Sequence, residues 1–228
     1  TSIYYSNDKF SITSDSLYRY NNQLASLKWD HEFNEKNKAE VILVNSQYKY
    51  NIDYEGNSNR NFDFGYKINE TQLKLNFDYF YSKKHKFKYG LSSKLYNVNP
   101  GTIEPSDLNS DVEYESLDKE KGLESAIYIA DLFEITDRLL LDIGLRYSFY
   151  ASLGPATKNI YQEGLPRNPS TIIGQETYGN NAVVKTYGGP EIRTSFRYFL
   201  TPSFSLKGSY NNTIQYIHLL SNNTTEAP

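Results

Sequence analysis

The stretch Leu132–Tyr150, LFEITDRLLLDIGLRYSFY, decides the fold class. Its second half alternates with hardly an exception between an apolar face and a more polar face: Leu139, Leu141, Ile143, Leu145, Tyr147 and Phe149 against Leu140, Asp142, Gly144, Arg146, Ser148 and Tyr150. A period of two predicts a β-strand, because successive side chains leave a pleated strand on opposite faces. Only Thr136-Asp137-Arg138 separates this strand from a strand-like segment before it. The stretch therefore predicts an antiparallel hairpin.

The composition also favours strands and excludes some classes of protein. Hydrophobic residues make up only 38 % of the 228 residues, but 22 Tyr, 12 Phe and one Trp raise the aromatic share to 15 %. Aromatic residues favour strands. The net charge of −3 argues against a nucleic-acid partner, for which a basic surface is expected. The absence of cysteine fits a bacterial envelope protein without a disulfide framework.

The same alternation recurs along the chain and predicts about eight long strands. Their ranges are 16–33, 38–54, 61–81, 86–98, 123–135, 139–150, 184–200 and 203–216. Short turns at 34–37, 82–85, 136–138 and 201–202 alternate with longer loops at 55–60, 99–121 and 154–183. Residues 1–15 are polar and irregular, so we expect a loop with a strand end there. The order is that of an antiparallel up-and-down sheet.

One irregularity lies inside the strand predicted over 61–81. Its apolar residues are even-numbered from Phe62 to Ile68 and odd-numbered from Leu73 to Tyr81. A one-residue slip moves every side chain to the other face, so either a turn or a β-bulge is expected near residues 69–71. We favour one strand with a bulge, because a turn would break the alternation of short turns and long loops.

Long strands with one apolar face and spaced charges on the other favour a transmembrane β-barrel. In such a barrel the apolar face meets lipid and the polar face meets a watery lumen. Predicted strands well beyond the usual length of about 5–6 residues count against a soluble sandwich. No apolar run approaches the roughly 20 residues of a membrane-spanning helix, but barrel strands need only about 9–11. Because neither an initiator Met nor a signal peptide is present, we expect a mature product or an excised piece.

Three segments resemble a known family. IYIADLFEITDRLLLDIGLRYS (127–148) is similar to a hairpin of TonB-dependent outer-membrane receptors, with its Y-x-x-D strand, T-D-R turn and L-x-L-x-x-G-L-R-Y strand. SYNNTIQYIHLLSNNTT (209–225) and LASLKWDHEFN (24–34) resemble the Bacteroidetes variety, which is related to SusC-like glycan importers.

The resemblance implies an all-β barrel of roughly 22 strands around a plug domain in the bacterial outer membrane. It implies uptake of a siderophore, vitamin, peptide or oligosaccharide, energised through the TonB complex. Implied partners are outer-membrane lipid and lipopolysaccharide, the plug, TonB and a surface lipoprotein. With about eight strands, residues 1–228 are expected to be part of the barrel domain, without the plug, the TonB box and the remaining strands. The alternative is an independent eight-stranded barrel with a structural or adhesive role.

No motif predicts catalysis, a cofactor or a metal site. The sequence has no G-x-S-x-G elbow and no glycine-rich phosphate loop, and His31, His85 and His218 show no metal-ligand spacing. The acidic segment 104–120 could bind Ca²⁺ through its oxygens, but it lacks the EF-hand spacing and is better explained as a solvated outer loop.

Two sets of residues are candidate ligand contacts. The first set faces the predicted lumen and consists of Asp142, Arg146, Arg193, Arg197 and Lys207. These residues are expected to line a ligand path, or equally to form the ion-pair lining that a wide barrel or its plug contact requires. The second set consists of Tyr161, Tyr178 and Tyr187, in or beside the longest loop. Their rings are predicted stacking platforms for a sugar, since an aromatic face combines apolar area with a polar tip.

Overall fold

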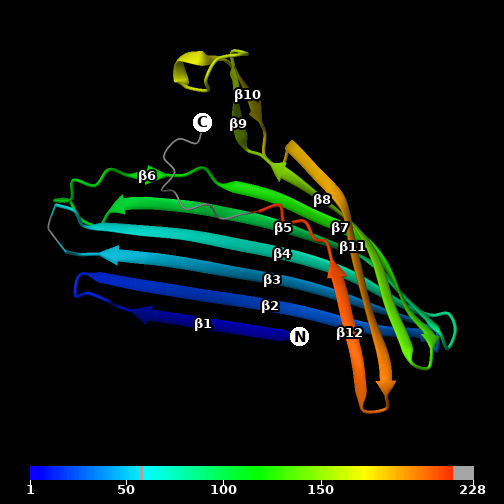
Figure 1. The fold of residues 1–228 in the computed structure, drawn as a ribbon. Helices are drawn as coiled ribbons and strands as arrows, with labels where there is room; N and C mark the ends of the chain where they lie inside the picture. The colour runs from blue at the N-terminus through cyan, green and yellow to red at the C-terminus, as the bar shows by residue number, and fades with distance from the viewer. Residues whose placement is uncertain (57–58, 218–228) are drawn as a thin grey trace.

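A computed structural model of the chain describes residues 1–56 and 59–217 as an all-β protein. Figure 1 shows one broad, curved sheet from which a small hairpin projects. The strands are β1 Ser2–Phe10, β2 Ser16–Asn34, β3 Asn37–Tyr54, β4 Phe62–Phe80, β5 His85–Pro105, β6 Glu115–Ser116, β7 Glu120–Thr136, β8 Leu139–Leu153, β9 Ala156–Tyr161, β10 Ile172–Tyr178, β11 Val183–Thr201 and β12 Phe204–Asn211. This part of the chain contains no helix long and apolar enough to cross a membrane.

The sheet follows the up-and-down order that the sequence predicts. Its strand order is β1-β2-β3-β4-β5-β7-β8-β11-β12, with every pair antiparallel and with the short β6 paired to β5. The opening hairpin is confirmed as β7 and β8, which pair from Lys121↔Leu153 to Thr136↔Leu139. Each of the eight predicted strands corresponds to one strand of this sheet.

Three segments predicted as loops contain further strand residues. The predicted loop 99–121 contains the end of β5, which continues to Pro105, and the two-residue β6 that pairs with it. Residues 2–10 form β1, which pairs residue by residue with β2 from Ser2↔Ser26 to Phe10↔Tyr18. Its sequence, SIYYSNDKF, has no sustained alternation because this edge strand is exposed on both faces. The predicted loop 154–183 contains the hairpin of β9 and β10, joined through a 3₁₀ turn at Pro169–Thr171.

The last strand is shorter than predicted. β12 ends at Asn211 instead of continuing to Tyr216. The following segment turns over β8, where the Tyr216 hydroxyl donates a hydrogen bond to the Ser148 carbonyl oxygen at 3.0 Å. The Tyr216 ring stacks on Tyr150 with a centroid separation of 5.5 Å. The Asn212 N–H still donates to the Ile192 carbonyl oxygen at 2.9 Å, and beyond it the chain leaves the backbone ladder and Tyr216 makes side-chain contacts with one face of the sheet.

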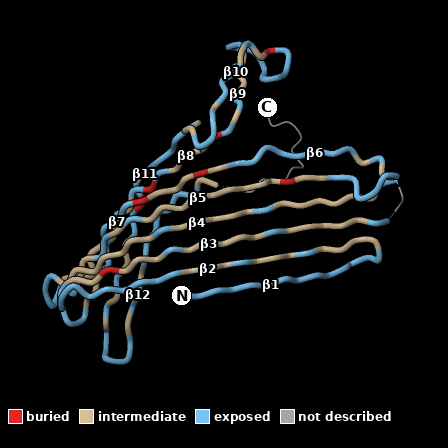
Figure 2. The backbone as a smooth tube through the Cα atoms, turned by 180° about the vertical axis from the view of Figure 1, so that it is seen from behind, coloured by how far each residue is buried: buried red, intermediate tan, exposed pale blue. Residues whose placement is uncertain are grey.

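The sheet is a single layer without an apolar core. Among the described residues, the only buried hydrophobic side chains belong to Ala39, Ala126 and Ala151, and Figure 2 shows few buried positions along the strands. A soluble sandwich would bury one face of each sheet. Here large apolar side chains in register, such as Ile129, Leu145 and Ile192, are about half exposed. The architecture is therefore a barrel wall and not a sandwich.

The apolar side chains gather on one face, which we call the outer face. They form a band across the sheet: Leu27, Trp29, Val41, Leu43, Leu73, Leu75, Tyr89, Leu91, Ile127, Ile129, Ile143, Leu145, Ile192 and Phe196. Soluble proteins rarely expose an apolar patch larger than a few hundred Å². A continuous apolar band with aromatic residues near its ends is the lipid-facing surface of an outer-membrane barrel. We call it the apolar band.

The switch of the apolar residues of β4 from even to odd positions is not caused by a β-bulge. One strand is confirmed over this region, but the predicted bulge at 69–71 is wrong, because β3 and β4 pair without interruption from Asn37↔Tyr79 to Tyr54↔Phe62. The irregularity of β4 lies elsewhere, against β5 between Gly65 and Lys67. β4 keeps its register with β3, so every position stays on its own face. The apolar residues occupy inner positions from Phe62 to Ile68 and outer positions from Leu73 to Tyr79.

The same exchange of faces occurs at one level on three neighbouring strands. On the side of the short turns, which we call below, Leu27, Leu43 and Leu73 share the outer face. On the side of the long loops, which we call above, Tyr20, Tyr50 and Tyr66 share the inner face. There the outer positions of β3 become the polar series Asn45, Gln47, Lys49 and Asn51. An outer surface that turns from apolar to polar marks the point where the strands leave lipid for water.

A charge placed in the apolar band tests this membrane surface. We expect Leu145→Arg to lower the free energy of unfolding of the membrane-embedded protein by about 2–4 kcal/mol, because an arginine near the bilayer midplane is costly on a lipid-facing strand. The matched control is Ser195→Arg, which lies on the inner face and in register with Asp142. Unfolding by guanidinium in lipid vesicles measures both. Equal losses for the two variants would contradict the assignment of the faces.

Candidate functional site

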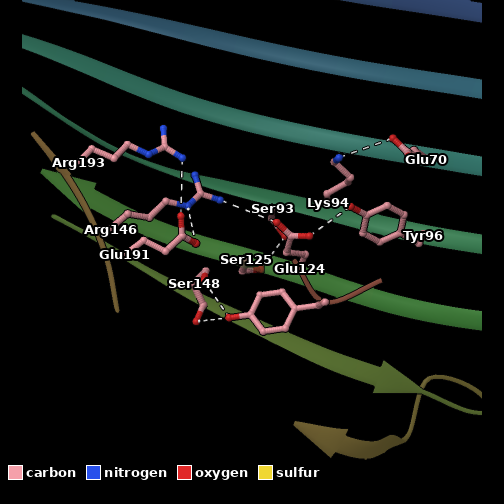
Figure 3. Close-up of polar contacts among 11 residues, drawn as sticks. Glu70, Ser93, Lys94, Tyr96, Glu124, Ser125, Arg146, Ser148, Glu191 and Arg193 are labelled. Atoms are coloured by element: carbon pink, nitrogen blue, oxygen red, sulfur yellow. Dashed lines mark hydrogen bonds and ion pairs between the residues drawn. The ribbon is translucent and has the colours of Figure 1, made fainter. Parts of the chain in front are cut away.

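The inner face carries a network of charged and polar side chains that crosses five strands. Alternation along each strand places these groups opposite the apolar band. Figure 3 shows most of the network, which runs from Glu70 on β4 through Lys94 and Tyr96 on β5 and Glu124 on β7 to Arg146 on β8 and Glu191 and Arg193 on β11. Its separations are 3.7 Å for Lys94 Nζ to Glu70 Oε2, 3.2 Å for the Tyr96 hydroxyl to Glu124, and 3.9 Å for Arg146 to Glu124.

Glu191 is the buried centre of this network. Its side chain is only 4 % exposed and lies between two guanidinium groups, with Arg146 Nε and Arg193 Nη2 each 3.6 Å from one of its oxygens. The register produces the arrangement, because Glu191 pairs directly with Arg146 across β8 and β11. A buried carboxylate is costly unless cations compensate for it. The Arg146–Glu191–Arg193 cluster therefore fixes the two strands to each other.

A second network lies lower on β2, β3, β4 and β7. Lys28 Nζ lies 2.7 Å from Glu40, the Asn76 amide donates to Glu40 at 2.6 Å, and the Tyr128 hydroxyl donates to Asn76 at 2.5 Å. Tyr128 reaches Asn76 across Gly90, which is in register with both residues. A Cβ on Gly90 would lie 2.7 Å from the Tyr128 hydroxyl oxygen and 2.1 Å from the Leu75 carbonyl oxygen. Glycine is required there chiefly because a Cβ would collide with the Leu75 carbonyl oxygen, and its absence also lets the Tyr128 side chain cross over the backbone.

The five predicted lumen residues lie together on the inner face of β8, β11 and β12. Asp142, Arg146 and Arg193 line a hollow of about 730 Å³, which Lys74 and Lys88 also border. Asp142 also lines an adjoining hollow of about 510 Å³ with Arg197 and Lys207. Arg197 and Lys207 pair directly across β11 and β12, so two cations stand side by side.

The structure divides these five residues into two groups. Arg146 and Arg193 are bound to Glu191, so their charges are already compensated. Within residues 1–56 and 59–217, none of the ion pairs includes Asp142, Arg197 or Lys207. The first group therefore links β8 to β11, whereas the second group makes no ion pair within the described residues.

The three predicted loop tyrosines do not meet in one place. Tyr161 pairs with Ile172 at the far end of the β9–β10 hairpin, where Arg167 lies 5.9 Å from its ring centroid. Tyr178 pairs with Ala156 at the other end, and its hydroxyl donates to Glu176 at 2.7 Å. This hydrogen bond to a carboxylate raises the pKa of Tyr178. Tyr187 belongs to β11 and lies beside Tyr150. Each ring is a separate surface.

The acidic segment is tied to its neighbouring loop by hydrogen bonds. The Asn61 amide donates to Asp107 at 2.8 Å and the Asn59 amide donates to Asp111 at 3.2 Å. The bond from Asn61, together with the backbone N–H of Asn109, lowers the pKa of Asp107. In the described part of the chain no group of three or more His, Asp or Glu side chains that could hold a metal ion is found. His218 lies outside the described residues.

One cluster on the inner face was not singled out from the sequence. We call it the tyrosine wall, and its members are Phe10, Tyr18, Tyr20, Tyr48, Tyr50, Phe64 and Tyr66. The signal was present in the parity change of β4 and in the alternating series Tyr48, Tyr50 and Ile52. Its meaning depends on the register of neighbouring strands, which fixes the face to which these residues point.

Comparison with known proteins identifies the family. The family model described as "TonB dependent receptor-like, beta-barrel" matches residues 1–223. The chain belongs to this family. TonB-dependent receptors reside in the bacterial outer membrane and are transporters and not enzymes, which confirms the predicted location, fold class and lack of an enzymatic role. No curated protein matches the sequence.

Solved structures of receptors share the fold of this TonB-dependent receptor barrel segment. The copper transporter OprC superposes with a TM-score of 0.57 at 9 % identity, over 86 % of this chain and 33 % of its own. The ferric citrate transporter FecA superposes with a TM-score of 0.55 at 16 % identity, over 87 % of this chain and 28 % of its own. BauA, the ferric preacinetobactin receptor from Acinetobacter baumannii, superposes with a TM-score of 0.55 at 14 % identity, over 86 % of this chain and 31 % of its own. The chain thus spans about a third of each of these proteins.

Neutralising Glu191 tests its role as the centre of the network. We expect Glu191→Gln in the full receptor to lower the free energy of unfolding by about 1–3 kcal/mol, because two guanidinium groups lose a charged acceptor. The control is Asp30→Asn, whose side chain is 63 % exposed and paired only with Lys28, so its loss is expected to cost about 0–1 kcal/mol. Denaturant unfolding measures both variants. An unchanged midpoint for Glu191→Gln would show that the cluster does not stabilise the wall.

Proposed function

We propose that this chain forms part of the wall of an outer-membrane receptor for TonB-energised uptake of a scarce solute. The observation that carries the proposal is the division of one sheet into an apolar outer face and a continuous charged inner face. A wall of this kind separates lipid from a watery path. Membership of the receptor family supports the same role.

The remainder of the barrel and its plug are part of the proposal. In the described residues β1 and β12 each pair with one neighbour only, so the sheet is open at both edges. Open edges expose unpaired backbone groups, which are not tolerated in lipid. Further strands would close the sheet into a barrel of roughly 22 strands around a plug domain. The share of each solved receptor that the chain covers supports this size.

The uncompensated inner charges are the proposed contacts with the plug or with the solute. Asp142, Arg197 and Lys207 border the smaller hollow near the turn between β11 and β12. A plug domain inside the barrel would face these groups, and so would a solute passing beside it. Lipopolysaccharide and phospholipid would contact the apolar band, and TonB would contact the plug.

The candidate solutes are a siderophore, a vitamin, a peptide or an oligosaccharide. OprC, FecA and BauA are named for copper, ferric citrate and ferric preacinetobactin, which supports import in general. Segments 24–34 and 209–225 resemble the Bacteroidetes SusC-like variety, which favours an oligosaccharide or a peptide and a surface lipoprotein as partner.

The alternative is an independent barrel with a structural or adhesive role. It would require β1 to pair with β12. The described strands do not make this pair, so the observed topology favours the receptor.

Deletion of the gene tests the proposal. We expect the deletion strain to lose growth when one class of solute is limiting, among ferric siderophores, cobalamin, peptides and neutral oligosaccharides. The gene in trans should restore growth, but not in a strain that lacks TonB, because uptake against a gradient requires energy from the inner membrane. Growth assays in defined media measure this loss. Normal growth on every class, combined with loss of surface adhesion, would favour the alternative.

A further inference from the structure

The tyrosine wall is a continuous row of aromatic rings across four strands. Phe10 stacks on Tyr18 with a centroid separation of 4.9 Å, and it also lies 5.7 Å from Tyr20. Tyr20 lies 4.9 Å from Tyr50, and Tyr50 lies 5.2 Å from Tyr66. Tyr48 and Phe64 fill the row, at 5.7 Å and 6.4 Å from Tyr66. The row therefore runs across β1, β2, β3 and β4, perpendicular to the strands.

The position of this row on the inner face is not explained by the membrane. Above the exchange of faces, the outer surface is polar and the rings point inward, away from lipid and water outside the barrel. No second layer covers them in the described structure, since the sheet is a single layer. Six of the seven side chains are half-buried, and Phe10 is exposed. A row of partly exposed rings facing a watery path offers apolar area to a passing solute.

The chemistry around the rings is mostly uncharged. Tyrosine supplies five of the seven members, and each carries a hydroxyl at the edge of an apolar face. Asn22 lies in register with Tyr48 and donates a hydrogen bond to Ser6 at 3.3 Å, so amide and hydroxyl groups continue the row on β1 and β2. Asp8, which is in register with Tyr20, adds one carboxylate beside the row, where it can accept hydrogen bonds from hydroxyl groups. Glu70, on the side of the short turns, is already bound to Lys94.

We propose that the tyrosine wall binds an elongated, uncharged solute that carries several rings, namely a neutral oligosaccharide. Each sugar ring would place an apolar face on an aromatic ring, and its hydroxyl groups would meet the tyrosine hydroxyls and the side chains of Asn22 and Ser6. The lower part of the inner face carries the cations Arg197 and Lys207, so it suits a later contact with the solute or with the plug. This inference rests on the proposed uptake function. It assigns to the tyrosine wall the first contact between the receptor and the solute.

Calorimetric titration of the full receptor in detergent tests the wall. The probes are a linear neutral glucan oligosaccharide, a charged uronic-acid oligosaccharide of similar length and a free catechol. We expect the neutral oligosaccharide to bind the unmodified receptor. Tyr50→Ala and Tyr66→Ala should each weaken this binding roughly 3- to 10-fold, as expected for the loss of one stacked ring. Tyr50→Phe, which keeps the ring, should retain most of the affinity.

The matched control is Tyr5→Ala. Tyr5 lies on the neighbouring β1 but pairs with Gln23 on the outer face, so its removal should leave binding unchanged. Folding of every variant is checked by the heat-dependent migration of the barrel in gel electrophoresis.

Three results would overturn the inference. They are no binding of the neutral oligosaccharide, equal binding by the alanine variants, and binding of the catechol or the charged oligosaccharide alone. Uptake measured in parallel separates the two proposals. If the receptor supports TonB-dependent growth on another solute and the tyrosine variants have no effect, the receptor function stands and the proposed role of the tyrosine wall is wrong. Absence of TonB-dependent growth on any solute would remove the receptor function itself.

Discussion

The backbone ladder between neighbouring strands is the interaction on which the rest of this structure depends. A chain that crosses lipid must satisfy its N–H and C=O groups internally, because no water is present to do so. The unbroken register from Asn37↔Tyr79 to Tyr54↔Phe62 shows how completely β3 and β4 meet this demand. Once the ladder is made, no apolar core is needed, and alternation alone assigns every side chain to lipid or to the lumen. This is why a chain with only 38 % hydrophobic residues can form a membrane wall.

The inner face uses charge where a soluble protein would use packing. Ion pairs in contact with water contribute little individually. Their value here lies in position, since Glu191 between Arg146 and Arg193 matches only one register of β8 against β11. The Tyr128 ring over Gly90 acts similarly on β5 and β7, because a shifted register would place a side chain under the tyrosine. Both arrangements specify strand pairing from the inner face, where hydrophobic burial is absent.

The sequence predicts the eight long strands and their turns well, because each depends on alternation within one strand. Leu139 to Phe149 is the clearest case. Other features depend on neighbours. β1 pairs through its backbone and carries no alternation, so Ser2–Phe10 could not be separated from a loop. The end of β12 at Asn211 depends on Tyr216 finding Ser148 and Tyr150, which are distant in sequence. Only the register of β4 against β3 shows that the parity change in β4 is an exchange of faces.

The level of this exchange also sets how the wall stands in the membrane. Sliding the sheet inward by two residues would bury Asn45 and Gln47 in lipid, and sliding it outward would expose Leu43 and Leu73 to water. Above this level β3 continues through residues 45–54, which at a usual strand rise and tilt extend roughly 25 Å beyond the lipid surface. The strands therefore build a raised rim whose interior is aromatic and whose exterior is hydrated. A solute that reaches this rim leaves bulk water well before it reaches the plane of the membrane.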